Sequence, residues 1–309
     1  MPNGASMDDP LSRYRPIVDD YGAFRAACER PLPKAVRVNT VKATPDEAVA
    51  ALEDDGVGVE RADWCDTVLR TDTDRPGNTW AAVHGWIHGQ EEVSAVPARV
   101  LDPQPGEAVW DACAAPGGKA TQCSALMDDR GTLVANDSNL GRLSGLRFNA
   151  ERLGLTSPVV TNRDARNYSL KPFAFDAFDR ALVDAPCSCE GTIRKNPDAL
   201  AEWGEGYLDE ISTLQTDILR RAVQATRDGG TVVYSTCTFA PEENEAVLDA
   251  VLDAEDCRLA PLDLPLTHAP GVTEWDGQRF DDSVARAARI YPHHNDTGGF
   301  FVAKLEVGA

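Results

Sequence analysis

Short apolar runs and amphipathic stretches alternate along most of this chain. Five runs of strand length lie at residues 108–110, 131–137, 159–161, 178–184 and 231–235. Apolar residues at helical spacing lie around these runs, at residues 93–101, 119–126, 139–153, 207–226 and 242–252. The longest of these helices is expected to stop at Gly229-Gly230, and the chain closes with a further apolar run at 298–305. Strands that alternate with helices predict an α/β fold with a parallel sheet over residues 91–309.

The first 90 residues follow a different pattern. Residues 36–41 alternate between apolar and polar positions as a strand does. A helix is expected over residues 45–54, because Thr44 can cap its first turn and Glu47 completes a capping box. Residues 1–42 hold seven basic and five acidic side chains, a local surplus of positive charge. We expect a small α+β module here that contacts an anionic partner, although pairing of these bases with acids elsewhere explains them equally well.

The stretch from Asp111 to Lys119, DACAAPGGK, joins a strand to a helix. Asp111 stands where the strand ends, residues 116–118 break regular structure, and helical spacing resumes at Lys119. Backbone N–H groups of a glycine-rich loop at a helix N-terminus suit a carboxylate or a phosphate. A carboxylate at a strand's end in an open α/β sheet points into the crevice where ligands bind. An ordinary strand-to-helix turn is the alternative.

Acidic residues follow the next strands of the predicted sheet. Asp137 lies 19 residues after Gly118, where a nucleotide-binding sheet carries the acid that binds the ribose hydroxyls. Asp164 and Asp184 follow the next two strands, although Asp164 is equally compatible with a helix cap. The glycines do not form a G-x-G-x-x-G motif, so an adenosyl ligand with a carboxylate tail is favoured over a dinucleotide.

Two cysteines follow strand ends and face the same predicted crevice. Cys187 lies just after the strand at 178–184, and Cys237 just after the strand at 231–235. The thiolate is the strong nucleophile among side chains, so these positions indicate covalent catalysis. Burial in the core is the usual alternative for a cysteine. We expect it for three others, which are Cys113, Cys123 and Cys257.

A metal site is not expected from the spacing of the candidate ligands. Cys187 and Cys189 are separated by one residue, whereas zinc motifs usually separate two cysteines by two or more. His293 and His294 are adjacent and therefore lack the spacing of a helical ligand pair. The sequence thus predicts chemistry without a metal ion.

Composition adds a strongly acidic charge to this picture. The chain has 30 Lys and Arg against 50 Asp and Glu, a net charge of −20, with a pI of about 4.6. An acidic surface usually repels nucleic acid, but it also occurs in proteins adapted to a cytosol rich in salt, which we favour. Eight cysteines and no apolar stretch after Met1 indicate a reduced, cytoplasmic protein. No apolar run is long enough to cross a membrane.

Five ordered motifs together resemble the RNA cytosine-5 methyltransferase family, the Nop2/Sun group with its RsmB-like members. They are DACAAPGGK at 111–119, AND at 135–137, DAPCSCEG at 184–191, STCTFAPEENE at 235–245 and RIYPHHNDTGGFF at 289–301. The similarity extends over about residues 36–305, since RVNT at 37–40 and the stretch 89–94 also match. It implies a Rossmann-like domain that binds S-adenosylmethionine, preceded by a module over residues 1–90 that contacts RNA.

The resemblance also implies roles for individual residues. The cofactor would be bound by Cys113, Ala114, Ala115, Pro116, Gly117, Gly118, Lys119, Asp137, Arg142, Asp164 and Asp184. Cys237 would be the nucleophile that adds to carbon-6 of cytosine, and Cys187 the second cysteine, which serves as the base for product release. Asp184 would hold the edge of the base at nitrogen-3, and Lys119 would support the pocket.

The expected activity is methylation of cytosine at carbon-5 in RNA, with transfer RNA favoured over ribosomal RNA and the chain acting as a monomer. The target base has to leave its stack to reach the crevice. Two other classes stay open. One is an RNA assembly factor that binds the cofactor without needing catalysis. The other is a DNA cytosine methyltransferase, in which Cys187 rather than Cys237 would form the covalent bond.

Overall fold

The computed structural model describes residues 9–200 and 205–308. Its larger sheet has nine strands in the order β11-β14-β15-β9-β8-β5-β6-β7, with β10 paired to β15. The parallel strands are β5 (Ala108–Asp111), β6 (Thr132–Asn136), β7 (Pro158–Thr161), β8 (Phe178–Asp184) and β9 (Thr226–Thr236). The chain reverses its direction of travel across the sheet between β5 and β8, which is the switch point where such folds bind ligands.

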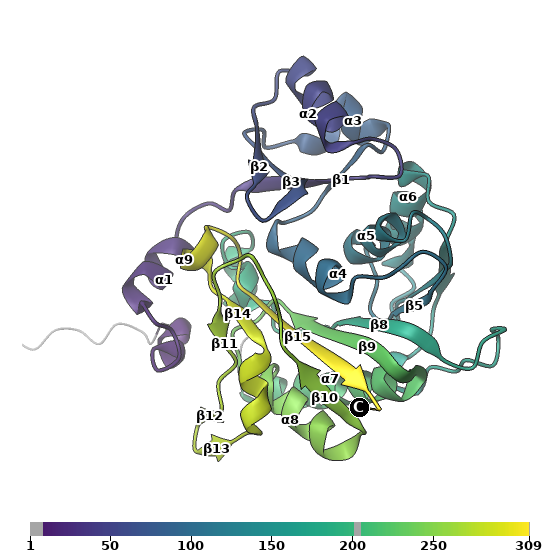
Figure 1. The fold of residues 1–309 in the computed structure, drawn as a ribbon. Helices are drawn as coiled ribbons and strands as arrows, with labels where there is room; N and C mark the ends of the chain where they lie inside the picture. The colour runs from purple at the N-terminus through teal and green to yellow at the C-terminus, as the bar shows by residue number, and fades with distance from the viewer. Residues whose placement is uncertain (1–8, 201–204, 309) are drawn as a thin grey trace, which may run out of the picture.

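The strands at the other edge of this sheet run antiparallel, so the prediction of a parallel sheet is wrong for this part. They are β10 (Cys257–Ala260), β11 (Ala269–Pro270), β14 (Ala288–Ile290) and β15 (Phe300–Val307). Because β14 and β15 are joined by a short connection, they pair as neighbours running in opposite directions. The sheet is therefore mixed, and the Rossmann-like arrangement holds for its five parallel strands (Figure 1).

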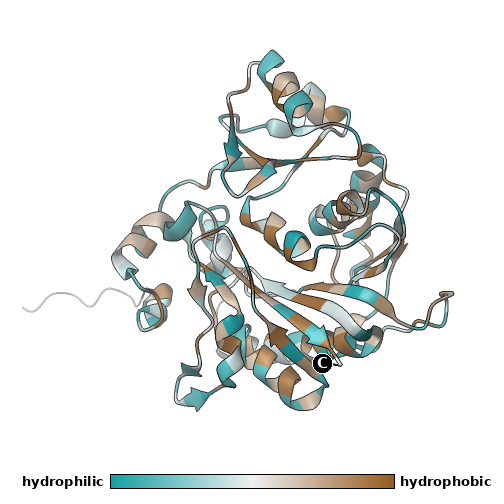
Figure 2. Ribbon diagram, viewed as in Figure 1, coloured by the Kyte–Doolittle hydropathy of each residue, from teal (hydrophilic) through white to brown (hydrophobic). Residues whose placement is uncertain are grey.

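Helices cover both faces of the larger sheet. Val109, Leu182 and Val233 pack against one layer of helices, made of α4 (Val96–Leu101), α5 (Gly118–Leu126) and α6 (Leu143–Leu153). Neighbouring strand residues such as Trp110 and Tyr234 face the opposite layer, made of α7 (Glu205–Ala225) and α8 (Glu245–Ala254). Successive strand residues are thus buried on opposite faces, as a parallel sheet covered on both sides requires. Figure 2 shows apolar and polar residues side by side on these amphipathic helices.

Gly229 and Gly230 do not end the long helix as predicted. Helix α7 ends at Ala225, and β9 begins at the next residue. A Cβ atom on Gly230 would lie 2.5 Å from Cγ2 of Thr226, so glycine allows the strand to start in a tight bend. The glycines therefore shape an irregular strand entry, where the pairing of β9 with β8 shifts its register.

A second, antiparallel sheet stands above the larger one in Figure 1. Its strands, in spatial order, are β2 (Val59–Ala62), β3 (Cys65–Thr71), β1 (Lys34–Val38) and β4 (Ile87–Gly89). Two helices cover it, α2 (Pro45–Asp54) and α3 (Trp80–Val83). The predicted capping box is confirmed, because the Thr44 hydroxyl accepts from the Glu47 N–H and the Glu47 carboxylate accepts from the Thr44 N–H.

Residues before the small sheet pack on the larger one. Helix α1 (Tyr21–Cys28) lies beside α9 (Pro292–Asn295) in Figure 1. Phe24 of α1 meets Phe239 edge-on, with ring centroids 5.1 Å apart. A hairpin, β12 (Glu274–Trp275) with β13 (Gln278–Arg279), and several 3₁₀ helices complete the fold, at Pro10–Tyr14, Pro76–Asn78, Val93–Ala95, Ala165–Asn167, Glu190–Thr192, Pro197–Leu200 and Asp282–Arg286. Within residues 9–200 and 205–308, no helix is both long enough and apolar enough to cross a membrane.

Candidate active site

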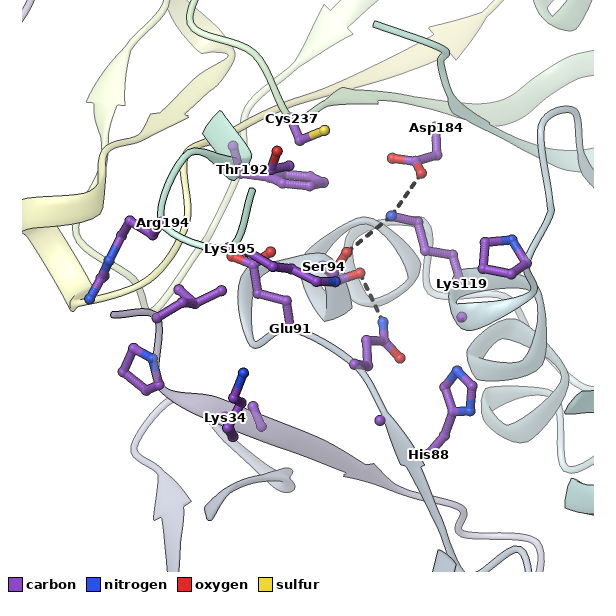
Figure 3. A pocket seen from close by; sticks show the side chains of 18 of the residues that line it. Lys34, His88, Glu91, Ser94, Lys119, Asp184, Thr192, Arg194, Lys195 and Cys237 are labelled. Carbon is purple, nitrogen blue, oxygen red and sulfur yellow. Dashed lines mark hydrogen bonds and ion pairs between the residues drawn. The ribbon is translucent and has the colours of Figure 1, made fainter. Parts of the chain in front are cut away.

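Two cavities meet at the carboxyl ends of the parallel strands. The larger, of about 720 Å³, lies between the two sheets and is lined from both, for example by Lys34 of β1 and Lys119 of α5 (Figure 3). The smaller, of about 650 Å³, lies over the ends of β6, β7 and β8. Both are lined by Cys113, Asp184 and Cys237. Groups bound in the two cavities would therefore face each other across these three side chains.

The glycine-rich loop before α5 is held in place by Asp137. One carboxylate oxygen accepts a hydrogen bond from the Asn139 N–H at 2.8 Å, and the other accepts from the Ala115 N–H at 3.3 Å. Arg142 approaches the same carboxylate at 3.2 Å and also donates to the carbonyl of Ala115. Asp137, Arg142 and the loop thus form one connected group at the edge of the smaller cavity.

Most of the predicted site residues line a cavity, but Gly117 does not. Its φ of +107° is a backbone conformation that favours glycine, and its N–H donates to the carbonyl of Ala114 at 2.7 Å. A Cβ at this position would lie 2.8 Å from Cδ1 of Leu146 on α6. Gly117 therefore lets the loop pack closely on α6. The other predicted residues of this stretch that line a cavity are Cys113, Ala114, Ala115, Pro116, Gly118 and Lys119.

Asp164 has the capping role that the sequence left open, and it also lines the smaller cavity. Its carboxylate accepts from the Arg166 N–H at 3.0 Å at the start of a 3₁₀ helix. The Arg166 guanidinium pairs with the same carboxylate at 2.7 Å. These hydrogen bonds hold the pKa of Asp164 below its usual value.

Lys119 and Asp184 form an ion pair on the floor of the larger cavity, visible as dashed lines in Figure 3. Lys119 Nζ lies 2.8 Å from one oxygen of Asp184 and 3.2 Å from the hydroxyl of Ser94. The other oxygen of Asp184 accepts from the hydroxyl of Ser235 at 2.9 Å. Burial lowers the pKa of Lys119, but Asp184 outweighs this and the net shift is upward, so the amine stays charged. The ion pair and these hydrogen bonds hold both side chains in place.

The two predicted cysteines meet where the cavities join. The Sγ atoms of Cys187 and Cys237 lie 3.5 Å apart, although 50 residues separate them in the chain. Hydrogen bonds between the loops that follow β8 and β9 fix this separation: the Gly191 N–H donates to the Cys237 carbonyl at 2.9 Å, and the hydroxyls of Ser188 and Thr238 lie 2.7 Å apart. The convergence of the two cysteines, expected from their places after neighbouring strands, is found.

The thiols share one hydrogen-bonded network that also includes Cys189, 3.9 Å from Cys187. Hydrogen bonds from Cys187 and Cys237 lower the pKa of Cys189. The hydrogen bond to Cys189, the hydrogen bond to Cys237 and burial raise the pKa of Cys187. A hydrogen bond from Cys187 lowers the pKa of Cys237, but Cys189, burial and nearby negative charge outweigh it, and the net shift is upward. One negative charge in the cluster is therefore stabilised by the remaining S–H groups.

Comparison with known proteins shows a family. The model of the family described as 16S rRNA methyltransferase RsmB/F matches residues 98–306. The tRNA (cytosine(49)-C(5))-methyltransferase of Pyrococcus abyssi is 36% identical over 96% of this chain and 94% of its own length. This chain belongs to the RsmB/F family. Ribosomal RNA small subunit methyltransferase F of Vibrio parahaemolyticus is 35% identical, and the chain spans only 58% of that relative.

Solved structures agree with the RsmB/F assignment. A methyltransferase homologue from Pyrococcus horikoshii is 32% identical, with a TM-score of 0.81 over 92% of this chain and 90% of that one. NSun6 from the same organism, solved with SFG, shares the fold with a TM-score of 0.80 at 22% identity. The predicted family and the Rossmann-like fold class are confirmed. The chain is an RNA cytosine-5 methyltransferase of the RsmB/F family.

One residue of the RsmB/F site was noticed in the sequence without being given a role. Asp111 is 1% exposed, and neither carboxylate oxygen has a hydrogen-bond partner of ordinary geometry among the described residues. Burial, reinforced by Asp184, raises its pKa to about 8, and the nearby Cys113 N–H offsets this only in part. Its position at a strand end was the available signal. A buried carboxyl group without a partner indicates that a ligand supplies one.

Two buried glutamates behind the cysteines were missed as site residues. Glu243 accepts from the Ser188 N–H at 2.9 Å and from the Ser188 hydroxyl, and Glu190 accepts from the Thr238 hydroxyl at 3.0 Å. Burial raises the pKa of both carboxyl groups. Both glutamates lie within the quoted motifs, but the contacts that define their role join residues far apart in the chain.

Proposed function

We propose that this chain methylates carbon-5 of a cytosine in transfer RNA, with Cys237 as nucleophile and Cys187 as the base that allows product release. The observation that carries the proposal is the 3.5 Å separation of the two sulfur atoms at the junction of the two cavities. A base in the larger cavity and a methyl donor in the smaller one would both be within reach of Cys237. The prediction from strand-end positions supports the same assignment.

The smaller cavity and the glycine-rich loop fit S-adenosylmethionine. The cofactor carries ribose hydroxyls, an amino group and a positively charged sulfur, and it supplies the methyl group. Asp137 and Asp164 would hold the adenosine portion, since carboxylates in this position accept from ribose hydroxyls. Asp111 lines the larger cavity, and it would offer its buried carboxyl group to a cationic portion of the ligand that extends past Cys113, where the two cavities meet. Arg142 and the loop from Cys113 to Lys119 would complete the contact, with Gly117 acting through the backbone shape of the loop.

Cys237 would add to carbon-6 of the cytosine ring as a thiolate. This addition makes the ring an enamine, so that carbon-5 becomes nucleophilic enough to accept a methyl group. Asp184 would hold the nitrogen-3 edge of the base, and its ion pair with Lys119 at 2.8 Å fixes the direction of that carboxylate. Cys187 would then remove the proton from carbon-5, after which the bond from Cys237 to carbon-6 breaks.

RNA would enter through the larger cavity with its target base turned out of the stack. Lys34 and Lys195 line this cavity and offer cationic groups for phosphates (Figure 3). Lys34 belongs to β1 of the small sheet, which supports the prediction that an N-terminal unit ending near residue 90 contacts RNA. The proposed steps use residues of one chain and no metal ion, so a monomer without a resident metal would suffice for the reaction.

Transfer RNA is favoured because the chain matches nearly the whole length of the archaeal relative named for tRNA, but about 60% of the bacterial relatives named for ribosomal RNA. Ribosomal RNA of the small subunit is the second candidate, supported by those relatives. Bisulfite mapping of RNA from a strain that lacks this gene tests both, since it shows which cytosine loses its methyl group. If methylation is lost only from ribosomal RNA, the tRNA proposal is wrong.

An in vitro assay separates the enzyme from its alternatives. Purified protein is given labelled S-adenosylmethionine and RNA from the deletion strain, with the Cys237→Ala variant as the control. The proposal expects transfer to RNA by the parent protein alone. Transfer to DNA in place of RNA would indicate the DNA enzyme, and binding of RNA without any transfer would indicate an assembly factor.

A further inference from the structure

The third cysteine of the cluster has no role in the reaction proposed above. Cys189 Sγ lies 3.9 Å from Cys187 Sγ, which in turn lies 3.5 Å from Cys237 Sγ, and all three sulfur atoms lie within 4.8 Å of one another. A tetrahedral zinc ion with Zn–S bonds of about 2.3 Å holds its sulfur ligands about 3.8 Å apart. The two measured separations fall on either side of this value, so an ion could bind with small adjustments of the side chains.

The backbone at Cys189 provides a separate observation. Its φ of 62° and ψ of 19° lie in the left-handed region, where glycine fits without steric cost and cysteine does not. This turn places the Cys189 sulfur beside Cys187, 3.3 Å from the Cys187 carbonyl oxygen. Backbone strain of this kind persists where it serves a site. A cysteine at a position that suits glycine therefore indicates a use for the thiol.

An ion could reach this cluster from solution. All three cysteines are partly buried and line the smaller cavity. The carboxylates nearby already have cationic partners: Asp137 pairs with Arg142, Asp164 with Arg166 and Asp184 with Lys119. The charge that neutralises a bound cation would therefore come from the thiolates. Thiolate clusters select soft cations such as Zn²⁺ over Mg²⁺ or Ca²⁺.

We propose that Cys187, Cys189 and Cys237 form a binding site for Zn²⁺, and that the bound ion reversibly stops methyl transfer. Each thiol that binds the ion gives up its proton to solvent, and no oxidation or reduction takes place. A fourth ligand, such as water, would come from the cavity that the three cysteines line. Once the sulfur of Cys237 is bonded to the ion, its electron pair is no longer available for carbon-6 of cytosine. The inhibitory half of this proposal rests on the proposed role of Cys237.

Spacing along the sequence does not reveal this site, because its three ligands are not all neighbours in the chain. Cys187 and Cys189 alone lack the usual separation of zinc ligands, but Cys237 comes from the loop after a different strand. The prediction that no metal takes part in the reaction is unaffected, because the ion proposed here opposes the reaction.

The binding test uses the full-length protein without RNA or cofactor. Zinc affinity is measured by competition with a chromophoric chelator, and Co²⁺ is used as a spectroscopic substitute, because cobalt–thiolate bonds give intense near-ultraviolet absorption. The parent protein is expected to bind one equivalent with this absorption. The Cys189→Gly variant should bind about 100-fold more weakly or worse, since one of three thiolate bonds is lost. This variant removes backbone strain, so it should fold, and Cys189→Ser provides a polar isostere.

The matched control is Cys257→Ser, which removes a partly buried thiol of β10 that lines neither cavity. It should bind zinc as the parent does. Methyl transfer is then measured at buffered zinc concentrations, relative to the metal-free rate of each variant, and Cys189→Gly should need more zinc for inhibition. Absence of the cobalt–thiolate absorption, or unchanged affinity in Cys189→Gly, would overturn the metal site. Zinc that binds through Cys189 while methyl transfer continues would overturn the inhibitory role, without affecting the binding result.

Discussion

Replacing Tyr14 by phenylalanine tests how the N-terminal segment supports the nucleophile. The Tyr14 hydroxyl donates to Glu190 at 2.7 Å, and both side chains are buried. The same Glu190 oxygen also accepts from the Thr238 hydroxyl at 3.0 Å and from the Phe239 N–H at 3.3 Å. These two residues directly follow Cys237. The hydroxyl of Tyr14 thus contacts the loop that carries the nucleophile indirectly, through Glu190.

The expected loss in the free energy of unfolding follows from the contacts that the substitution keeps and the one that it removes. Tyr14→Phe keeps the ring that packs against Phe239 and Trp275, with centroids 5.8 and 6.1 Å away. It removes one hydrogen bond to a buried carboxylate, which is worth about 1.5–3 kcal/mol when the acceptor is charged. Tyr21→Phe is the matched control, because the Tyr21 hydroxyl donates at 2.8 Å to Asp9, far from the cysteines. The control should cost about 0.5 kcal/mol or less.

The loss of stability in Tyr14→Phe should depend on pH in a definite direction. Burial raises the pKa of Glu190, and the hydrogen bond from Tyr14 partly offsets that rise. A group whose pKa is higher in the folded state stabilises the fold at low pH and loses this contribution as the pH rises through the folded value. Without the Tyr14 hydroxyl the pKa of Glu190 rises further. The difference between parent and variant should therefore be small below about pH 4 and should grow toward neutral pH.

Urea unfolding at several pH values measures these differences in free energy, and single-turnover methyl transfer reports on the nucleophile. Tyr14→Phe should slow transfer while cofactor affinity stays near the parent value, because Asp137, Asp164 and the loop from Cys113 to Lys119 lie outside the loops that follow β8 and β9. If Tyr14→Phe and Tyr21→Phe have the same stability, the same pH profile and the same rate, the connection from Tyr14 through Glu190 to the Cys237 loop is refuted.

Three other predictions address the site itself. Cys237→Ala should abolish both methyl transfer and any covalent bond to RNA, whereas Cys187→Ala should accumulate a protein–RNA adduct that survives a denaturing gel; the opposite pattern would exchange the two roles. Asp137→Ala should weaken S-adenosylmethionine binding by about 1.5–3 kcal/mol in isothermal titration, and unchanged affinity would remove Asp137 from the ribose site. The pKa of Asp111 is raised to about 8, so its carboxyl group becomes negatively charged as the pH rises through that value. Cofactor affinity should therefore increase over this pH range, and Asp111→Asn should flatten the increase. An identical pH profile in the variant would show that Asp111 does not contact the cofactor.

Local signals in the sequence were sufficient where neighbouring residues decide the structure. The capping box of Thr44 and Glu47 was predicted from a spacing of three residues and is found. The strand ends at Asp111 and Asp184 were visible as apolar runs that close on an acid. Convergence of Cys187 and Cys237 followed from a topological rule, because neighbouring parallel strands end at the same edge of the sheet.

Features that depend on distant pairing were not predicted. An apolar run such as residues 300–307 reads the same in a parallel and an antiparallel strand, so the direction of β15 could not be inferred. The contact of Tyr14 with Glu190 joins positions 176 residues apart, and no periodic pattern encodes it. Gly229 and Gly230 were interpreted as a helix stop because glycine signals a break without saying which element follows.

The acidic composition is compatible with an RNA substrate if binding uses few phosphate contacts, and the positions of the arginines agree with such binding. Arg37, Arg194 and Arg289 are buried, and their guanidinium groups bind internal partners such as Gln90, the Thr297 carbonyl and Glu245 respectively. Such arginines hold the fold together and offer little charge to phosphates, so the surface is more acidic than the composition alone suggests. RNA affinity that depends on few phosphate contacts decreases only slightly as the salt concentration rises, because few counterions are released on binding. We therefore expect RNA recognition to rest mainly on one base held in the larger cavity, because a concentrated salt solution would weaken that contact less than contacts to phosphates.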